Sequence, residues 1–498
     1  MKHFFSDLAE SIKNVFRGPA SKENLYSLDK RVSLKNAIPF GLQHILVMLA
    51  SNIAPIIIVF STIGLFNTDF AVHAMLAALF MAGIGTMFQL LIGSRLPIII
   101  GTSFTFVPIL ITIGLSAGGG EDAYYTIIGS LIIGGLFAMV FSLLYRFWGR
   151  LIKPIVPSIV VLGLGLSLLA SGATSFFGGS SVIASVIETG QTPSGVPYFC
   201  YIIVAIVTVI SAVLWSLLFK GIWRNINIIV GITVGFIVSC CIPGMVNFSG
   251  LAIDSASLVG PHGIFDFPRF VNLTKIRFAL VPCILTTICY ILVIVETIGS
   301  STALVSSALG RQANNRELTG SMFGNSFAST VGALFGGFPL ITYAQNVSVV
   351  AQNKIINRFT IFIGAAILLL VSFFPPIANL IFAIPDSVIG GTMVVLFGSI
   401  MVIGMRSIAE LGWSDKNIMI TSISVCLGFG LTIANVTLSN GQLAVVTDLF
   451  TSLGASWLGD LLSNNVLNMF IIAFVLSWAL PENMHISLFH KKEDKKDN

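Results

Sequence analysis

The chain has 498 residues, of which 55% are hydrophobic and only 9% are charged. Soluble domains carry roughly 25% charged residues, so this composition excludes a soluble protein and indicates an integral membrane protein. The net charge of +5 does not by itself indicate a nucleic-acid surface. The sequence contains no phosphate-binding loop, nucleophile–base pair or metal-ligand cluster. We therefore expect that the protein is not an enzyme and that it has no cofactor and no metal site.

The apolar segments predict an all-α polytopic membrane protein, because about 20 apolar residues are needed to cross a bilayer. Fourteen spans follow a cytoplasmic N-terminal segment, 1–37, and precede a cytoplasmic tail, 482–498. Several of them are short or interrupted. The predicted spans are 38–60, 71–92, 97–116, 124–145, 154–172, 198–219, 225–246, 278–300, 318–336, 341–353, 359–375, 380–402, 418–437 and 466–481.

The positions of the charges support this topology, because Lys and Arg concentrate in cytoplasmic loops. With the N-terminus inside, only Arg269, Lys275 and Arg277 of the 26 basic residues fall in outside loops. The outside loops carry acids instead. Both ends of the chain are therefore predicted to be cytoplasmic. The basic N-terminal segment is predicted to lie along the anionic inner leaflet.

Fourteen spans divide into two repeats of seven, 38–246 and 278–481. Because each repeat has an odd number of spans, the second repeat has the opposite orientation in the membrane to the first. Inverted repeats place the substrate near the midplane, at discontinuous helices in matching positions. The third span of each half has this character, reading Leu96-Pro97-IIIGTSF and Phe338-Pro339-LITYAQN. Proline blocks helix and the β-branched run favours a strand. We expect short antiparallel strands in spans three and ten; the alternative is two ordinary interrupted helices.

Glu296 is the one carboxylate in an otherwise uncharged stretch, Phe278–Gly310. A charge this deep in lipid costs at least about 2.5–3.5 kcal/mol, so such residues usually face a cavity and a ligand. Glu296 could accept an N–H from a ligand or carry a coupled proton. Ser300, one turn later, could complete the site. Alternatively, Glu296 is a structural acid bonded to the backbone of the broken helices.

Gln345 and Asn346 are adjacent amides, each with donors and an acceptor, which suits a planar ligand with alternating N–H and C=O groups, such as an oxopurine or uracil. They could instead cap a half-helix. Phe104 could lie against the ring face. The residues expected to bind the substrate are Glu296, Gln345, Asn346, Phe104, Ser103, Tyr343 and Ala344.

Two further polar residues lie inside apolar spans. His44 is suited to a hydrogen bond between helices, and a packing role is favoured for it. Asn325 could tether span nine to the site. Together with Glu296 and Ser300, they form the set of residues expected to couple transport to a driving ion.

Four motifs resemble the nucleobase–ascorbate transporter family, which includes bacterial uracil and xanthine permeases and fungal urate/xanthine permeases. The motifs are GLQHILVM, GTSFTF, VETIGSSTALVS and FPLITYAQNVSVV. The resemblance implies fourteen segments in two inverted repeats, core and gate domains, and a homodimer. It also implies that Glu296 and Gln345 contact the base. The resemblance further implies that Phe104 packs on the base, that His44 is tied into the core network, and that Asn346 matches the Asn that follows the second base contact.

The resemblance also bears on the substrate. Purine-type members tend to have Gln-Asn in span ten, as here, whereas uracil-type members tend to have Glu-Asn. Ser300 and Asn325 stand where xanthine-type members often carry Asp. We expect an importer of xanthine or urate driven by proton symport, with sodium possible as the driving ion. A uracil permease is the alternative. An anion exchanger or channel is a third reading, although Glu296 would repel an anion.

Overall fold

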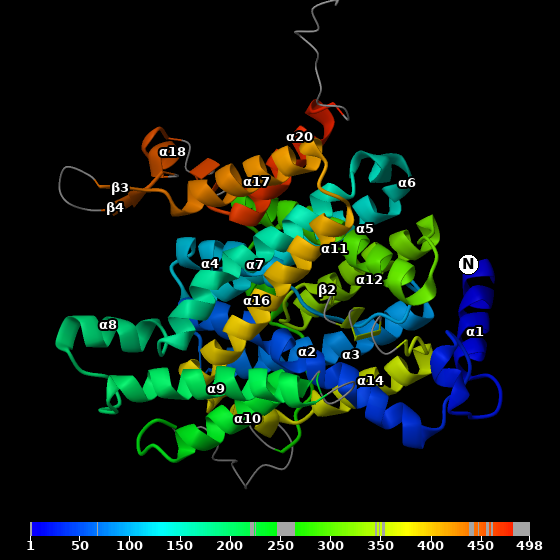
Figure 1. Cartoon of the computed structure of the whole chain (residues 1–498), viewed down its shortest axis with the longest axis horizontal. Coiled ribbons are helices and arrows are strands. Elements are labelled where there is room, and N and C mark those ends of the chain that lie inside the picture. Colours follow the sequence, from blue (N-terminus) through cyan, green and yellow to red (C-terminus); the bar gives the residue numbers. More distant parts are fainter. Residues whose placement is uncertain are drawn as a thin grey trace, which may run out of the picture.

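The structure is a computed structural model that is almost entirely helical (Figure 1). It describes residues 2–66, 68–219, 224, 226–246, 264–343, 346–347, 349–350, 354–437, 443–446, 448–454, 458–459 and 462–481. In this part of the chain, eight helices are long and apolar enough to cross a membrane.

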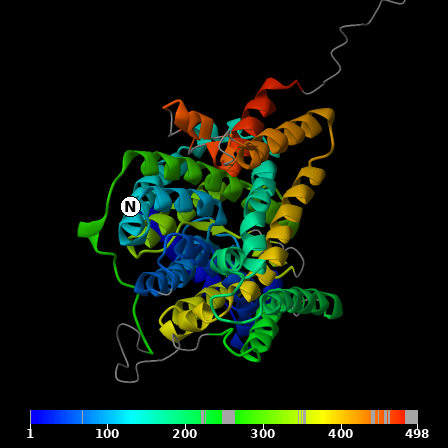
Figure 2. The same cartoon turned by 90° about the vertical axis from the view of Figure 1, so that its left-hand side faces the viewer.

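Most of the helices fall into two groups, each packed mainly on its own members. The first helix group comprises α2 (Leu34–Thr62), α3 (Asp69–Leu91), α4 (Val107–Ser116), α5 (Gly120–Leu143), α11 (Leu280–Leu309), α12 (Asn315–Leu334) and α14 (Arg358–Val371). The second helix group comprises α7 (Ile155–Phe176), α9 (Tyr198–Leu218), α10 (Asn227–Cys240), α16 (Asp386–Glu410), α17 (Asp415–Ile433) and α20 (Asn465–Ala479). The second group is centred on α7 and α16, which run side by side in both Figure 1 and Figure 2.

Shorter elements connect the helices, and most of them were not predicted. They are α6 (Tyr145–Trp148), η3 (Gly149–Leu151), α8 (Ser180–Thr189), η6 (Leu273–Lys275), α15 (Pro375–Phe382), β3 (Asn435–Thr437), β4 (Leu443–Val445) and α18 (Asp448–Ser452).

Several predicted spans have different limits in the structure. The span predicted at 278–300, for example, is a helix that continues to Leu309. Two other spans differ for a reason that is visible in their sequence. The span predicted at 380–402 is divided: its first residues belong to α15, which ends at Phe382, and α16 runs from Asp386, after Pro385, to Glu410. The residue before a proline is disfavoured in helix. The span predicted at 418–437 ends as helix at Ile433. Its last residues form β3, antiparallel to β4, because Val436 and Thr437 are β-branched and favour a strand.

The two proline-containing spans meet as a pair of short strands. β1 (Ile100–Thr102) pairs antiparallel with β2 (Leu340–Thr342), and Gly101 faces Ile341 at the centre. The backbone N–H of Ser103 donates to the carbonyl of Pro339 over 2.8 Å and extends the pairing by one residue. All six strand residues are buried.

Side chains from three helices bond to the outward backbone groups of this small sheet. Thr86 of α3 accepts from the N–H of Ile100, and Asn52 of α2 accepts from the N–H of Thr102 over 2.7 Å. Ser329 of α12 accepts from the N–H of Leu340 over 2.8 Å. Non-helical backbone at membrane depth is stable only where protein or a cavity satisfies it. These three side chains therefore allow the two strands to exist in the middle of the first helix group.

The three basic residues that break the charge pattern are each paired with an acid. Lys275 and Glu121 are 2.7 Å apart, Arg277 and Asp122 are 2.7 Å apart, and Arg269 and Asp266 are 2.9 Å apart. The hydrogen bond that Lys275 donates to the Glu121 carboxylate raises the pKa of Lys275. All six residues fall in loops or helix ends predicted to be outside. The exceptions are therefore cations neutralised by neighbouring acids on the same predicted side.

The N-terminal segment is folded onto the first helix group. We call α1 (Lys2–Phe16), η1 (Glu23–Tyr26) and the loop to residue 33 the N-terminal clamp. Its apolar contacts include Val15 and Leu25, which pack with Ile355 and Phe359 at the start of α14. The ring of Phe16 lies edge-on to Phe359, with centroids 5.5 Å apart.

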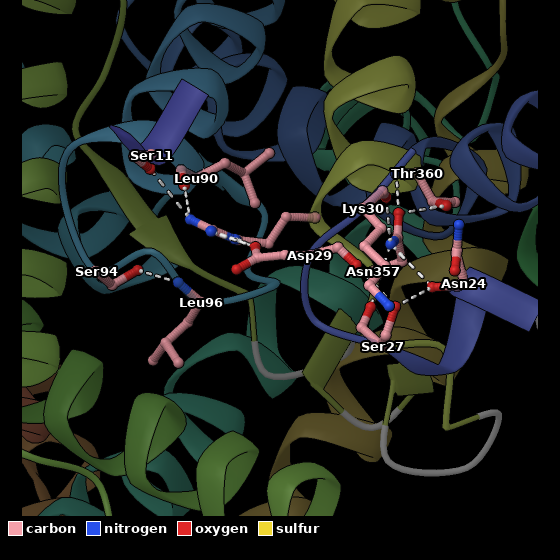
Figure 3. A network of polar contacts seen from close by, with 11 residues as sticks. Ser11, Asn24, Ser27, Asp29, Lys30, Leu90, Ser94, Leu96, Asn357 and Thr360 are labelled. Atoms are coloured by element: carbon pink, nitrogen blue, oxygen red, sulfur yellow. Dashed lines mark hydrogen bonds and ion pairs between the residues drawn. The ribbon is translucent and has the colours of Figure 1, made fainter. Parts of the chain in front are cut away.

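Polar contacts fix the N-terminal clamp to the start of α14 (Figure 3). The side-chain amide of Asn357 donates to three clamp carbonyls, those of Asn24, Ser27 and Lys30, at 2.9–3.1 Å. The Arg358 guanidinium pairs with Asp29 and donates to the carbonyl of Leu90, at the end of α3, over 2.8 Å. One charged pair thus joins segments 329 residues apart.

The Asp29–Arg358 pair is asymmetric, which gives a testable prediction. The Arg358 side chain is 4% exposed and that of Asp29 is 36% exposed. Asp29→Ala leaves the buried Arg358 guanidinium without its acidic partner. The free energy of unfolding should therefore fall by about 3 kcal/mol or more. Arg358→Met in the Asp29→Ala background should recover part of this loss. The measurement is the thermal unfolding midpoint of each purified variant.

The exposed Arg406–Glu410 pair provides the control. Its side chains are 80% and 64% exposed, so Glu410→Ala should cost less than about 1 kcal/mol. Equal losses for Asp29→Ala and Glu410→Ala would contradict a structural role for the buried pair.

Candidate functional site

Glu296 lies in the middle of α11, is 7% exposed, and points at the segment that follows β1. Its Oε2 accepts a hydrogen bond from the Thr105 hydroxyl over 2.9 Å. Thr105 belongs to η2 (Phe104–Phe106), the single turn between β1 and α4. The carboxylate that the sequence singles out is therefore bonded to the end of the first interrupted span.

Ser103 ends the strand and caps this turn. Its backbone is extended, with φ −82° and ψ 127°, and its hydroxyl oxygen accepts from the N–H of Thr105 over 3.3 Å. The chain therefore changes from strand to half-helix within two residues. The N-terminal end of a half-helix carries free N–H groups and a partial positive charge, and here it begins beside Glu296.

Phe104 lies at the contact between the two helix groups. Its ring is buried and packs edge-to-face on Phe397 of α16, with centroids 5.3 Å apart and ring planes at 83°. A cavity of about 280 Å³ lies nearby between α2, α10, α15 and α16, lined by apolar residues that include Leu49, Met393 and Leu396. Phe104 thus lies at the boundary between the two helix groups.

In the second interrupted span, Tyr343 and Asn346 follow the strand β2. The Tyr343 N–H donates to the carbonyl of Ile99, and its hydroxyl donates to the carbonyl of Thr102 over 2.9 Å. The Nδ1–H of His44 in α2 donates to Oδ1 of Asn346 over 3.1 Å. The Asn346 side-chain nitrogen has no partner among the described residues. Ala344 and Gln345, which we predict to bind the substrate, lie outside the described residues.

Asn325 is the hub of a buried amide network beneath the strands. Its Oδ1 accepts from Gln89 of α3 over 2.8 Å. Its nitrogen donates to the hydroxyls of Thr297 and Thr342, at 3.0 and 3.2 Å. Thr297 follows Glu296 in α11, and Thr342 ends β2. Ser300 is also buried on α11, one turn beyond Glu296.

The comparison with known proteins places these residues in a family. A family model described as "Permease family" matches residues 35–437, which is most of the chain. The chain belongs to this permease family. It is the nucleobase–ascorbate transporter family that the four motifs resemble, so that resemblance is confirmed. The protein is a multi-pass membrane permease and not an enzyme.

Several curated relatives of the permease have names that state what they carry. The uric acid permease PucJ of Bacillus subtilis is 28% identical over 403 residues, 79% of this chain and 84% of that protein. The xanthine permease XanP of Escherichia coli is 26% identical over 474 residues, 93% of this chain and 95% of that protein.

Solved structures share the permease fold at low identity. The transmembrane domain of the cyanobacterial bicarbonate transporter BicA matches with a TM-score of 0.54 and 19% identity, covering 78% of this chain and 94% of that chain. The murine anion transporter SLC26A9 matches with a TM-score of 0.56 and 12% identity, covering 84% of this chain and 67% of that chain. This likeness concerns the fold alone.

The sequence did not identify three residues that hold the permease site together. Thr105, the partner of Glu296, stands inside the GTSFTF motif but has no distinguishing chemistry. Asn52 and Gln89 are single amides in apolar helices, and both are fully buried. A buried amide costs free energy unless it is hydrogen-bonded, so isolated amides in apolar spans are a signal that could have found both.

Gly101 gives a test of the strand pair. A side-chain carbon at this position would lie 2.6 Å from the Tyr343 ring and 2.8 Å from Oδ1 of Asn52, whereas one at Gly398 would meet nothing within 4 Å. Gly101→Ala should lower the stability of the permease by about 1–3 kcal/mol, the usual cost of overpacking. Gly398→Ala is the matched control and should not lower stability. Equal unfolding midpoints for both variants would contradict the close packing at β1.

Proposed function

We propose that the permease imports an oxopurine nucleobase, xanthine or urate, by proton symport. The observation that carries the proposal is the buried Glu296 carboxylate, bonded to Thr105 where β1 turns into a half-helix. A carboxylate at this depth is costly without a ligand, a proton or a strong partner. The names of the relatives, uric acid permease and xanthine permease, support the choice of substrate class.

Recognition rests on groups that match the edges and faces of a planar base. Glu296 accepts a ring N–H in place of the Thr105 hydroxyl. Gln345 presents an amide donor and acceptor to an adjacent N–H and C=O pair. The Phe104 ring covers one face of the base. Asn346 is held in place by His44, which leaves its side-chain nitrogen available to the substrate.

Proton coupling follows from the same carboxyl group. Glu296 is the only acid in Phe278–Gly310, and a buried carboxyl can exchange a proton when its surroundings change during transport. Protonation removes the charge that would otherwise oppose movement through the apolar boundary between the helix groups. The coupling role of Asn325 and Ser300 is to position α11, since the Asn325 amide bonds to Thr297, next to Glu296.

The movement that carries the substrate is a displacement of the first helix group, the core domain, against the second, the gate domain. We further propose that the chain forms fourteen spans in two inverted repeats, 38–246 and 278–481, and that both of its ends are cytoplasmic. Two copies of the chain form a homodimer. The two matched strands that follow Pro97 and Pro339, paired as β1 and β2, support the repeat, and the charges of the loops support the orientation.

An anion exchanger or channel is the second candidate, because the fold also occurs in a bicarbonate transporter. The charges of the site argue against it. The segments 96–145, 278–310 and 318–353, which form the site, contain no Lys or Arg. The negative charge of Glu296 would repel an anion at the half-helix.

Uptake in cells that lack nucleobase transport separates these functions. Radiolabelled xanthine, urate, guanine, hypoxanthine and uracil are compared, with and without a protonophore and with and without sodium. We expect xanthine or urate uptake that the protonophore abolishes and that does not need sodium. Uptake of uracil alone would support the uracil permease, and chloride or bicarbonate flux without nucleobase uptake would support the anion transporter.

Glu296→Gln tests the carboxylate. The variant loses the charged acceptor and the titratable group, and a hydrogen bond to a charged group contributes about 1.5–3 kcal/mol. Initial uptake at low substrate concentration should therefore fall at least about tenfold. Glu188→Gln makes the same change at an exposed carboxylate and should leave uptake unaltered. Normal, protonophore-sensitive uptake by Glu296→Gln would remove Glu296 from the mechanism.

Gln345→Glu tests the specificity of the amide pair. A carboxylate can only accept hydrogen bonds, whereas the amide both donates and accepts, and the resemblance associates Glu-Asn with uracil. We expect uracil to become the better competitor of residual uptake and xanthine the poorer one. Unchanged ranking in a competition assay would show that Gln345 does not select the base.

A further inference from the structure

Four basic residues of the N-terminal clamp are brought together by its backbone. Lys13 and Arg17 lie at the end of α1, and Lys30 and Arg31 lie in the loop that returns beside it. The N–H of Lys30 donates to the carbonyl of Asn14 over 3.1 Å, and that of Arg31 donates to the carbonyl of Arg17 over 3.2 Å. We call Lys13, Arg17, Lys30 and Arg31 the basic corner.

The basic corner is exposed and has no acidic partner in the part of the chain that the structure describes. All four side chains are exposed, and the ion pairs of the described residues involve none of them. Asp29, the acid nearest in sequence to Lys30, is already paired with Arg358. The positive charge of the basic corner is therefore available to a ligand.

The loop holds this arrangement firmly. The side-chain amide of Asn24 donates to the carbonyl of Arg31 over 2.8 Å and to that of Pro19 over 3.2 Å. Lys30 has φ +90°, a left-handed conformation that favours glycine. A lysine persists there only when its surroundings determine the backbone. The backbone that carries the basic corner is thus fixed by specific contacts.

The basic corner lies close to the start of the first membrane-length helix. Arg31 is three positions before Leu34, where this helix, α2, begins. Exposed apolar side chains flank the cations, namely Ile12 and Phe16 on α1 and Leu34 and Ile38 on α2. In Figure 1, α1 stands upright at the right-hand edge, whereas α9 lies across the view. A helix that carries cations beside exposed apolar residues is suited to the membrane interface.

We propose that the basic corner binds the headgroup of an anionic phospholipid. A cluster of four or more Lys and Arg residues next to a span attracts anionic lipid, and the apolar residues beside it accept the start of the acyl chains. A zwitterionic headgroup gains little from this charge. The lipid is therefore a specific ligand of the permease and not only its solvent.

This ligand acts on the fold through the N-terminal clamp. Lys30 and Arg31 directly follow Asp29, the partner of Arg358, and the carbonyl of Lys30 accepts from Asn357. Figure 3 shows Lys30 and Asp29 beside Asn357, at the start of α14. A headgroup that binds the basic corner contacts the same loop that holds α14 and adds to the interactions that keep it folded. Binding therefore stabilises the first helix group.

The test is thermal unfolding of the full-length protein in detergent, with added phosphatidylglycerol or phosphatidylcholine. A ligand that binds only the folded state raises Tm, and we expect phosphatidylglycerol to raise Tm by about 2 °C or more and phosphatidylcholine not to. Lys30→Gln/Arg31→Gln should lose this rise. Arg146→Gln/Arg150→Gln, which removes two other exposed cations on the same predicted side, should keep it.

If the first double variant does not purify as a folded protein, Lys13→Gln/Arg17→Gln on α1 replaces it with the same expectation. Equal effects of both lipids, or a full phosphatidylglycerol effect in the basic-corner variants, would overturn the proposal. So would an equal rise with glycerol phosphate in place of lipid, because that result assigns the basic corner to a soluble phosphate. None of these measurements depends on nucleobase transport, so the proposed function can fail without affecting them.

Discussion

The structure depends on one constraint, which is that the backbone of two interrupted spans must be hydrogen-bonded at a depth where there is no water. β1 and β2 satisfy part of each other's backbone, and Thr86, Asn52 and Ser329 bond to outward-facing N–H groups. Unsatisfied backbone groups in lipid cost several kcal/mol each. The three helices that carry these side chains must therefore pack around the strands, and this requirement organises the first helix group.

The same constraint explains why polar chemistry gathers at the strand ends. Once the strands are fixed, the chain that leaves each of them begins a new helical segment with free N–H groups. Ser103 and Thr105 follow β1 and meet Glu296, and Asn346 follows β2 and meets His44. A ligand-sized group of donors and acceptors, including one carboxylate, thus arises inside an apolar protein without any large polar domain.

Two contacts tie this site to distant parts of the chain. The Gln89–Asn325 bond links α3 to α12, and Asn325 reaches both β2 and the residue after Glu296. The N-terminal clamp fixes the start of α14 through Asn357 and Arg358. Both contacts consist of buried polar groups that are costly to leave unpaired. They restrict the first helix group to one arrangement, which suits a domain that is proposed to move as a body.

Much of this organisation could be predicted from local sequence. Pro97 and Pro339 with their β-branched neighbours mark the interruptions, and Glu296 stands out because a lone acid in an apolar helix is costly. The family resemblance drawn from the motifs was confirmed by the family match. The predicted roles of Gln345 and Ala344 stay predictions, because both residues lie outside the described residues.

Other features could not be predicted because they depend on contacts between distant segments. Nothing near Thr105 in the sequence indicates that its hydroxyl meets Glu296, which lies 191 positions away. The basic N-terminal residues predict attraction to a membrane surface, but the fold of that segment is fixed by Asn357 and Arg358. The short β3–β4 hairpin was missed because its few apolar residues continue the preceding helical pattern.

The most direct test of the central claim is an electron cryomicroscopy map of the full-length protein with bound xanthine. The account predicts density for a flat ring between the ends of β1 and β2, with a ring nitrogen within hydrogen-bonding distance of the Glu296 carboxylate and one face against Phe104. A ring bound elsewhere, with the Glu296–Thr105 bond intact, would contradict it.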